Sequence, residues 1–244
     1  MDTFGDPTDP TILLIHGGGN TRLSWEDDFC ARLAAGGRHV IRYDLGARSS
    51  LRELVDDAAD IIGDRAGHVV GLSLGGMIGQ RLALDHPSRV ASLVLASTTP
   101  GGEGLPAPAE GLFENEPDAP DWTDRDAVIE YLVEVERPYS PRFDEGAARA
   151  TATRVVDSGA DVQAAMENFS LDMGEPWRGR LGDIRVPVLV IHGDADPMFP
   201  LAHGRALADE IPGASLLVLE GVGHEYFPRA TWDVVVPAIL RHTV

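Results

Sequence analysis

Residues 68–76 read HVVGLSLGG, a short apolar run followed by a Gly-x-Ser-x-Gly pattern. The run has the continuous hydrophobicity of a strand that is buried on both faces, and the residues after it have helical periodicity. Gly71 and Gly75 allow a sharp strand-to-helix turn, from which the hydroxyl of Ser73 projects above the strand. The helix N-terminus behind Ser73 supplies free N–H groups for a developing negative charge. The sequence therefore predicts Ser73 as a nucleophile, with a tight structural turn as the alternative.

On both sides of this stretch, short apolar runs alternate with helical patterns. We expect strands at Thr11–Ile15, His39–Tyr43, His68–Leu72, Val90–Ala96, Val188–His192 and Ser215–Leu219. Helices are expected at Ser24–Ala35, Leu51–Ile62, Gly75–Asp85, Leu201–Ile211 and Ala230–His242. Continuous apolar strands joined by helices are typical of parallel strands, so the sequence predicts an α/β fold with a doubly wound, mostly parallel sheet.

The alternation stops between residues 98 and 182. This stretch is loop-like at first and then holds two helical patterns, one after Thr123, which with Asp126 resembles an N-terminal cap, and one over Asp144–Val156. No strand pattern returns before Val186. We expect residues 1–97 and 183–244 to form one core, and residues 98–182 to form a helical cap inserted between two core strands.

The composition limits the partners and the chemistry. The 244 residues include 39 acidic and 20 basic side chains, giving a formal charge of −19, and every basic residue is arginine. Excess negative charge repels phosphate backbones, so we expect no nucleic-acid partner. Without lysine there is no Schiff-base nucleophile and no phosphate-loop lysine. Residues 101–180 hold 18 acidic residues and 7 arginines, so more than half of the excess lies in the expected cap.

Several other classes of site have no support in the sequence. The single cysteine, Cys30, cannot form an internal disulfide and is expected to be a small buried residue. Residues 1–6 show no signal peptide, and the longest apolar runs are far shorter than the roughly 20 residues that span a bilayer. We expect a cytoplasmic protein without membrane insertion. Because metal-ligand spacings and dinucleotide fingerprints are missing, we also expect no metal and no cofactor.

Residues 15–20 read IHGGGN and follow the first expected strand. Successive glycines bring backbone N–H groups close to a ligand, although a flexible loop is the alternative. This loop can face the serine turn across the carboxyl edge of the sheet, where such folds bind ligands. We assign two oxyanion-binding N–H groups to Gly18 and Leu74, and we expect His16 to shape the loop.

Two later loops carry acids and a histidine. Residues 190–197 read VIHGDADP, and residues 221–224 read GVGH. Serine, then aspartate, then histidine is the chain order of a triad on this scaffold. In such a triad His224 removes the serine proton and later protonates the leaving group, while a carboxylate orients the imidazole. From the residues alone, both Asp194 and Asp196 are open as the acid.

With these motifs, the chain resembles the α/β-hydrolase superfamily over nearly all of its length apart from the insert. Residues 16–18 resemble the oxyanion loop of that family, residues 71–75 its elbow, residues 193–196 its acid loop and residues 221–224 its histidine loop. The Gly-x-x-Asp pattern of the family implies Asp196 as the triad acid, with Asp194 as the lesser choice. The insert corresponds to the cap of the family, which forms one wall of the substrate pocket.

Shorter matches are similar to the actinobacterial esterase branch that contains aclacinomycin methylesterase. They lie at residues 4–7, 18–20, 39–44 and 84–87. The branch removes a methyl group from a polyketide ester. Two departures stand out. The family normally has a β-hairpin before the oxyanion strand, whereas residues 2–10 precede it here, so an edge strand is in question. The family loop R-G-x-G-x-S is replaced by LGARS at 45–49, which shortens one rim of the pocket.

A serine nucleophile argues against the haloalkane dehalogenases and epoxide hydrolases of the superfamily, which use an aspartate at this position. We expect cleavage of a carboxylic ester of a small, neutral and apolar molecule through an acyl-enzyme, with the acidic cap disfavouring anionic esters. A lactonase, a C–C hydrolase, an acyltransferase and a perhydrolase share the same triad, and a non-catalytic ligand-binding protein is the alternative from another class.

Trp25, Met77 and Met198 are expected at the pocket. Further candidates, with core packing as the alternative, are Phe113, Trp122, Tyr139, Phe169, Trp177 and Phe199.

Overall fold

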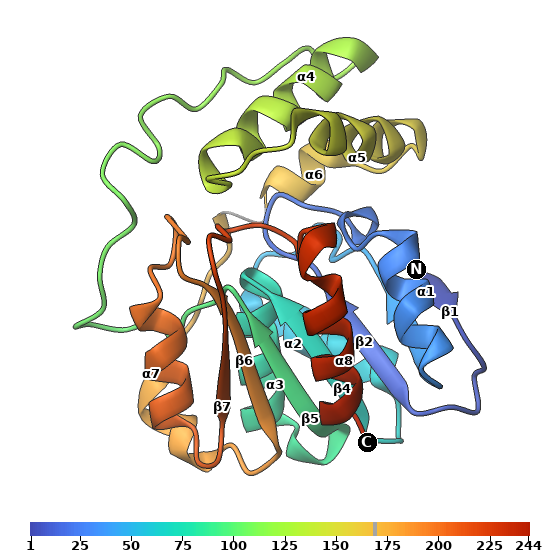
Figure 1. The fold of residues 1–244 in the computed structure, drawn as a ribbon, viewed down its shortest axis with the longest axis vertical. Coiled ribbons are helices and arrows are strands. Elements are labelled where there is room, and N and C mark those ends of the chain that lie inside the picture. The colour runs from blue at the N-terminus through green and yellow to red at the C-terminus, as the bar shows by residue number, and fades with distance from the viewer. Residues whose placement is uncertain (168–169) are drawn as a thin grey trace.

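A seven-stranded sheet forms the centre of the molecule (Figure 1). The structure is a computed structural model in which residues 1–167 and 170–244 are described. The strand order is β1-β3-β2-β4-β5-β6-β7, and only β1 runs antiparallel to its neighbour. The strands are β1 (Asp2–Phe4), β2 (Thr11–Ile15), β3 (His39–Arg42), β4 (Gly67–Leu72), β5 (Val90–Ala96), β6 (Val188–Gly193) and β7 (Ser215–Leu219). The predicted α/β class with a mostly parallel sheet is confirmed.

Helices cover both faces of the sheet. Residues of α2 (Leu51–Ile62), α3 (Leu74–Asp85) and α7 (Ala202–Glu210) pack in the core cluster on one face. Residues of α1 (Asp27–Ala35) and α8 (Trp232–His242) pack in the cluster on the other face. Within the described ranges, no helix is long and apolar enough to span a bilayer.

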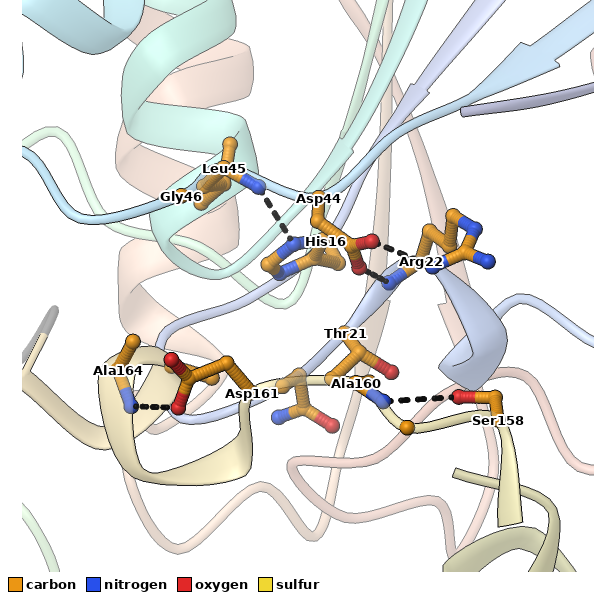
Figure 2. A pocket seen from close by; sticks show the side chains of 13 residues that line it. His16, Thr21, Arg22, Asp44, Leu45, Gly46, Ser158, Ala160, Asp161 and Ala164 are labelled. Atoms are coloured by element: carbon orange, nitrogen blue, oxygen red, sulfur yellow. Dashed lines mark hydrogen bonds and ion pairs between the residues drawn. The ribbon is translucent and has the colours of Figure 1, made fainter. Parts of the chain in front are cut away.

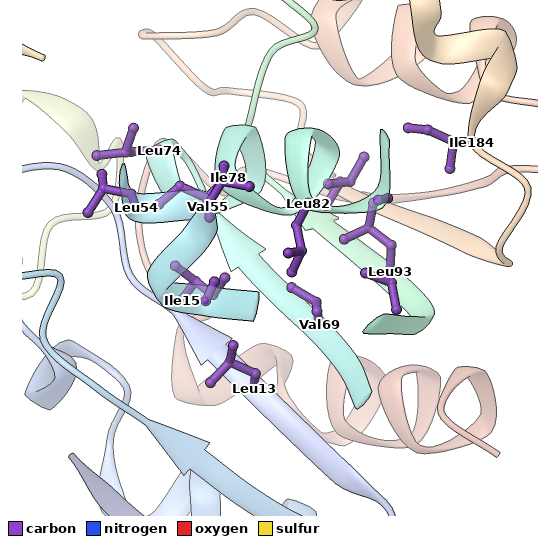
Figure 3. Close-up of a cluster of buried hydrophobic side chains, with 14 of the residues drawn as sticks. Leu13, Ile15, Leu54, Val55, Val69, Leu74, Ile78, Leu82, Leu93 and Ile184 are labelled. Atoms are coloured by element: carbon purple, nitrogen blue, oxygen red, sulfur yellow. The ribbon is translucent and has the colours of Figure 1, made fainter. Parts of the chain in front are cut away.

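Strand β2 explains why the strands read as continuous apolar runs. Leu13 and Ile15 point into the cluster of α2 and α3, where Figure 3 shows them beside side chains of β4 and β5. Ile12 and Leu14 point into the opposite cluster, and all four side chains are fully buried. Because successive residues of a strand face opposite sides, a strand covered on both sides needs apolar residues at every position. Cys30 is buried in the second cluster, as expected.

The insert between β5 and β6 carries α4 (Arg125–Glu136), α5 (Glu145–Asp157) and α6 (Val162–Glu167), which lie above the carboxyl ends of the strands (Figure 1). The prediction of Thr123 as the cap of the first helix is wrong. Asp124 caps α4 by accepting the N–H groups of Asp126 and Ala127, because an Asp side chain at this position reaches two N–H groups. The short helix α6 has no clear pattern in the sequence.

The last part of the insert returns to the core. Trp177 and Leu181 lie inside the expected 98–182 cap, yet they pack in the cluster of α2 and α3. The Trp177 indole N–H donates to the side-chain oxygen of Gln80 on α3 at 3.0 Å. At the edge of the sheet away from β7, the three-residue strand β1 pairs antiparallel with β3, so the edge strand that the sequence put in question is present.

Candidate active site

Ser73 lies in a strained turn between β4 and α3. Its backbone has φ 53° and ψ −115°, a conformation that a residue with a Cβ rarely adopts. Such strain is kept only when the surroundings hold it, at a cost of about 1–3 kcal/mol. Here the Ser73 N–H donates to the Ala96 carbonyl at 2.9 Å, and the Ser73 carbonyl accepts the Thr98 hydroxyl at 2.7 Å. The neighbouring strand β5 and the loop after it therefore fix the turn.

Close backbone contacts explain the glycines of the Gly-x-Ser-x-Gly pattern. A Cβ on Gly71 would lie 2.1 Å from the Gly75 carbonyl oxygen, and a Cβ on Gly75 would lie 2.2 Å from the Ile15 carbonyl oxygen. Both distances are far inside van der Waals contact with backbone atoms that cannot move independently. The turn thus seats α3 directly against the end of β2, which brings Ser73 next to the oxyanion loop.

The structure brings Ser73, His224 and Asp196 together in one hydrogen-bonded row. The Ser73 Oγ lies 3.0 Å from the His224 Nε2, and the His224 Nδ1 lies 2.9 Å from the Asp196 Oδ2. The Asp196 side chain is fully buried. Asp194 lies elsewhere, because its Oδ1 accepts the Gly221 N–H at 2.6 Å and so anchors the loop that carries the histidine.

The acid loop and the cap hold the two ends of this row. The Oδ1 of Asp196 accepts the N–H groups of Met198 and Phe199 at 2.9 and 2.8 Å, which leaves its Oδ2 directed at His224. The Phe199 ring packs edge-on against the His224 ring at 5.2 Å. From the cap, the Tyr139 carbonyl accepts the His224 N–H at 2.8 Å. The cap therefore contacts the backbone of His224 and also lies above the carboxyl ends of the strands.

His16 shapes the oxyanion loop, as the sequence predicted. Its Nε2 accepts the Leu45 N–H at 3.2 Å, so its Nδ1 carries the proton and donates to the Gly17 carbonyl at 2.8 Å. Burial lowers the pKa of His16, which keeps the ring neutral. Because the C=O and N–H of a trans peptide point in opposite directions, this bond turns the Gly18 N–H away from His16. Gly17 itself lies against the serine turn, since a Cβ there would be 3.4 Å from the Ser73 Cβ.

Two further sets of hydrogen bonds hold the same loop from the other side. The Gly17 N–H donates to the Tyr226 hydroxyl at 3.0 Å. The Ser24 hydroxyl donates to the Asn20 Oδ1 at 2.8 Å, and the Asn20 Nδ2 donates to the Gly18 carbonyl at 3.1 Å. Both sets end on the loop itself. Within the described part of the structure, the Gly18 and Leu74 N–H groups have no acceptor.

A cavity of about 310 Å³ lies beside this loop (Figure 2). Its walls come from His16 and residues 20–22 of the oxyanion loop and from residues 44–46 after β3. Residues 158–161 between α5 and α6, with Ala164 and Ala165 of α6, complete the lining. Figure 2 shows the Arg22–Asp44 ion pair and the bond from Leu45 to His16 in its wall. The replaced family loop at 45–49 thus borders the cavity directly.

The three side chains expected at the pocket do not line this cavity. Trp25 is 2% exposed and packs in the core against Phe29, because its large apolar ring gains most by leaving water. Met77 packs against the cluster of α2 and α3, and the N–H of Met198 serves the Asp196 carboxylate. The candidate Phe169 lies outside the described residues.

Glu136, the last residue of α4, stands out among the glutamates of the cap. Glu130 and Glu134 on the same helix pair with Arg149 and Arg137 at 2.6 and 2.7 Å. Glu136 has no such partner among the described residues. Burial raises the pKa of Glu136 to about 7, with the His224 imidazole opposing the rise and the Glu225 carboxyl adding to it. The side of the cap that faces the histidine thus carries a carboxyl that titrates near neutrality.

The described residues do not provide the group of ligands that a metal ion needs. No group of three or more His, Cys, Asp and Glu in residues 1–167 and 170–244 is arranged to hold a metal ion. The row from Ser73 to Asp196 is instead suited to moving a proton from a hydroxyl to an imidazole, with a buried carboxylate to stabilise the cation that forms.

Comparison with known proteins places the chain in a family. A family model described as "Alpha/beta hydrolase family" matches residues 12–238. The chain belongs to the α/β hydrolase family. Rhodomycin D methylesterase DauP of Streptomyces sp. (strain C5) is 34% identical to this hydrolase over 98% of this chain and 93% of the relative. Rhodomycin D methylesterase DnrP of Streptomyces peucetius is 32% identical with the same coverage.

Solved structures support the fold of the hydrolase. The esterase RhEst1 from Rhodococcus sp. ECU1013 superposes with a TM-score of 0.79 at 18% identity, covering 99% of this chain and 94% of that one. This likeness concerns the fold alone. The sequence named Tyr139 only as a pocket candidate and did not predict the contacts by which Tyr139 and Tyr226 link distant loops. Tyr226 lies 209 residues from its partner Gly17, and no local pattern reports such a pairing.

Proposed function

We propose that this ester hydrolase cleaves a carboxylic ester through a triad of Ser73, His224 and Asp196. The His224 Nε2 accepts the Ser73 proton as the Oγ attacks the ester carbonyl, and the resulting imidazolium then protonates the departing alkoxide. The alcohol leaves and an acyl-enzyme remains on Ser73. Water, deprotonated by His224, attacks that acyl group, and the carboxylic acid leaves as the serine regains its proton.

The oxyanion in this proposal is stabilised by two backbone N–H groups. The Leu74 N–H lies at the start of α3, where the helix dipole favours negative charge. The Gly18 N–H belongs to the loop that His16, Tyr226 and Asn20 hold. Donors that are fixed before the reaction stabilise the developing charge without reorganisation, which is why a rigid loop suits this role.

For the substrate we propose a methyl ester of a molecule without negative charge, and a neutral, apolar acid part fits best. The names of the two methylesterase relatives favour the methyl ester. The excess of acids in residues 101–180 favours a neutral or cationic ester, because like charges repel near a low-dielectric cleft.

The observation that carries the proposal is the row of hydrogen bonds from Ser73 through His224 to Asp196. A fluorophosphonate probe tests it directly, with intact mass and peptide mapping as the readout. We expect one adduct on Ser73 in the wild type and none in Ser73→Ala. A wild type that is not labelled, or a Ser73→Ala variant that is labelled equally, contradicts the proposal.

A substrate panel then separates hydrolysis from the other reactions of this triad. Esters of p-nitrophenol from acetate to decanoate are compared with bulky methyl esters, lactones and added acyl acceptors. We expect release of free acid from the methyl esters. Labelling of Ser73 without turnover of any ester, but with lactone opening, C–C cleavage or acyl transfer, would assign the triad to that reaction instead.

A further inference from the structure

His192 lies at the end of β6, one turn before the acid of the proposed triad. Its side chain is fully buried. The Nε2 of its ring lies 2.7 Å from the Phe199 carbonyl oxygen. A carbonyl oxygen can only accept, so this nitrogen must carry the ring proton. The bond spans residues 193–198 and ties Phe199 back to the end of β6.

The other ring nitrogen makes no hydrogen bond within the described structure. The His192 Nδ1 is buried and has no hydrogen-bond partner among the described residues. The backbone of α7 covers it, since a Cβ on Gly204 would lie 2.8 Å from this atom. A buried polar atom without a partner is uncommon in folded proteins and calls for an explanation.

The neighbours of the ring supply that explanation. His192 lies close enough to Asp196, His203 and His224 for their charges to influence its pKa. Its Nε2 is 3.6 Å from the Asp196 Oδ2, the same oxygen that holds His224 at 2.9 Å. A second imidazolium at this place would compete with His224 for the carboxylate. With no acceptor at Nδ1, a second proton on the ring would be buried without a partner, and so the ring stays neutral.

We propose that His192 is a positioning residue for the triad acid. Its Nε2–H fixes the Phe199 carbonyl, and the bare Nδ1 keeps the ring neutral so that the Asp196 carboxylate is directed at His224 alone. The inference rests on the hydrolytic function proposed above. Burial also lowers the pKa of His192, against the opposing effects of its bond to Phe199 and of the Asp196 charge.

His192 affects the proposed reaction through two contacts of Phe199. Its N–H is one of the two donors to the Asp196 Oδ1, and its ring packs edge-on against the His224 ring. If the Phe199 carbonyl is released, the turn is free to relax, and both the carboxylate and the imidazole lose part of their support. Displacements of about 1 Å in such a site cost up to about 10²-fold in rate.

The test compares His192→Leu with His192→Gln, whose side-chain NH₂ can replace the Nε2–H donor. For His192→Leu we expect kcat to fall by about 10- to 100-fold with KM little changed. The acid limb of the kcat/KM profile should move to lower pH, because a less well held carboxylate stabilises the imidazolium less. His192→Gln should recover most of both effects.

The matched control is His68→Leu, which removes another buried histidine bond, from Nδ1 to the Ser92 hydroxyl, at the opposite end of the sheet. It should lower stability without moving the pH profile. A His192→Leu variant with the control's kinetics, or a His192→Gln variant as impaired as His192→Leu, overturns the proposal.

A measurement on the wild type keeps the inference testable if the leucine variant does not fold. In ¹⁵N-histidine-labelled protein, the Nδ1 of His192 should show the shift of a bare, unprotonated nitrogen from about pH 5 to about pH 9. Titration of this ring within that range overturns the inference. Failure of fluorophosphonate labelling would instead contradict the hydrolytic function, so the two failures are distinguishable.

Discussion

Removal of the Tyr226 hydroxyl tests whether its hydrogen bond to the oxyanion loop matters for catalysis. In Tyr226→Phe the Gly17 N–H loses its acceptor. A buried donor left without an acceptor costs about 1–3 kcal/mol. The packing of the ring stays, because the edge-on contact with Trp25 at 5.1 Å does not involve the hydroxyl. We therefore expect a loss of stability in that range.

The effect on the rate follows from how the loop is held. Loss of one oxyanion donor costs about 10²–10³-fold in kcat. In Tyr226→Phe the Gly18 N–H stays in place partly through His16 and Asn20, so we expect a smaller fall in kcat, of roughly 10- to 100-fold. KM should change little, because the hydroxyl contacts the backbone of the loop. The assay is kcat and KM on a p-nitrophenyl ester, with urea unfolding of the same preparations.

Tyr43→Phe is the matched control. Tyr43 is 5% exposed, and its hydroxyl has no hydrogen-bond partner in the described part of the chain, so its removal leaves no orphaned donor. We expect stability that is unchanged or slightly higher, and unchanged kcat. The reasoning is refuted if Tyr226→Phe unfolds and turns over like the wild type, or if the two variants show equal losses.

Two further predictions concern the acids. Asp196→Asn should lower kcat by roughly 10⁴-fold, because the carboxylate that holds His224 is lost. Asp194→Ala removes only the acceptor of the Gly221 N–H, so it should lower stability and leave most of kcat. Steady-state rates and urea unfolding of both variants distinguish the two outcomes. Burial holds the pKa of Glu136 at about 7, above its ordinary 4.5, so between these two values the folded state binds a proton that the unfolded state has lost, and stability falls as the pH rises from about 4.5 to about 7. Glu136→Gln should therefore have a higher Tm than the wild type above pH 7 and an equal Tm below pH 4.5, whereas Glu134→Gln, with its exposed arginine partner, should show no such gain. Equal Tm values for wild type and Glu136→Gln at all pH values would contradict the second prediction.

The parts of the fold that follow from local patterns were predictable from the sequence. The strands at Thr11–Ile15, Val90–Ala96 and Ser215–Leu219 and the helix at Leu51–Ile62 have the bounds that their hydrophobic patterns predict. In the two inner strands burial on both faces decides nearly every residue, and in the helix one buried stripe does, whereas Ser215 and Val218 of the edge strand are exposed. The strand–turn–helix at Ser73 was predictable because its glycines follow a fixed local pattern, although the contact that requires Gly75 is with Ile15, which is distant in the sequence.

The parts that depend on long-range contacts were not predictable. Trp25 was expected at the pocket and lies in the core, because a large ring beside a glycine-rich loop fits both places equally well in the sequence. Trp177 returns to the core from the insert through a partner on α3. The choice of Asp196 over Asp194 came from the family resemblance. The residues alone left it open, because the loop N–H groups that hold Asp196 are visible only in the folded chain.

A backbone hydrogen bond joins the cap to His224, the base of the proposed triad. The Tyr139 carbonyl holds the His224 N–H, so a cap that swung away from the core would have to break that bond. Loss of that bond would remove one of the contacts that fix the position of His224 next to Ser73. The cap is thus coupled to the proposed triad as well as lying above it.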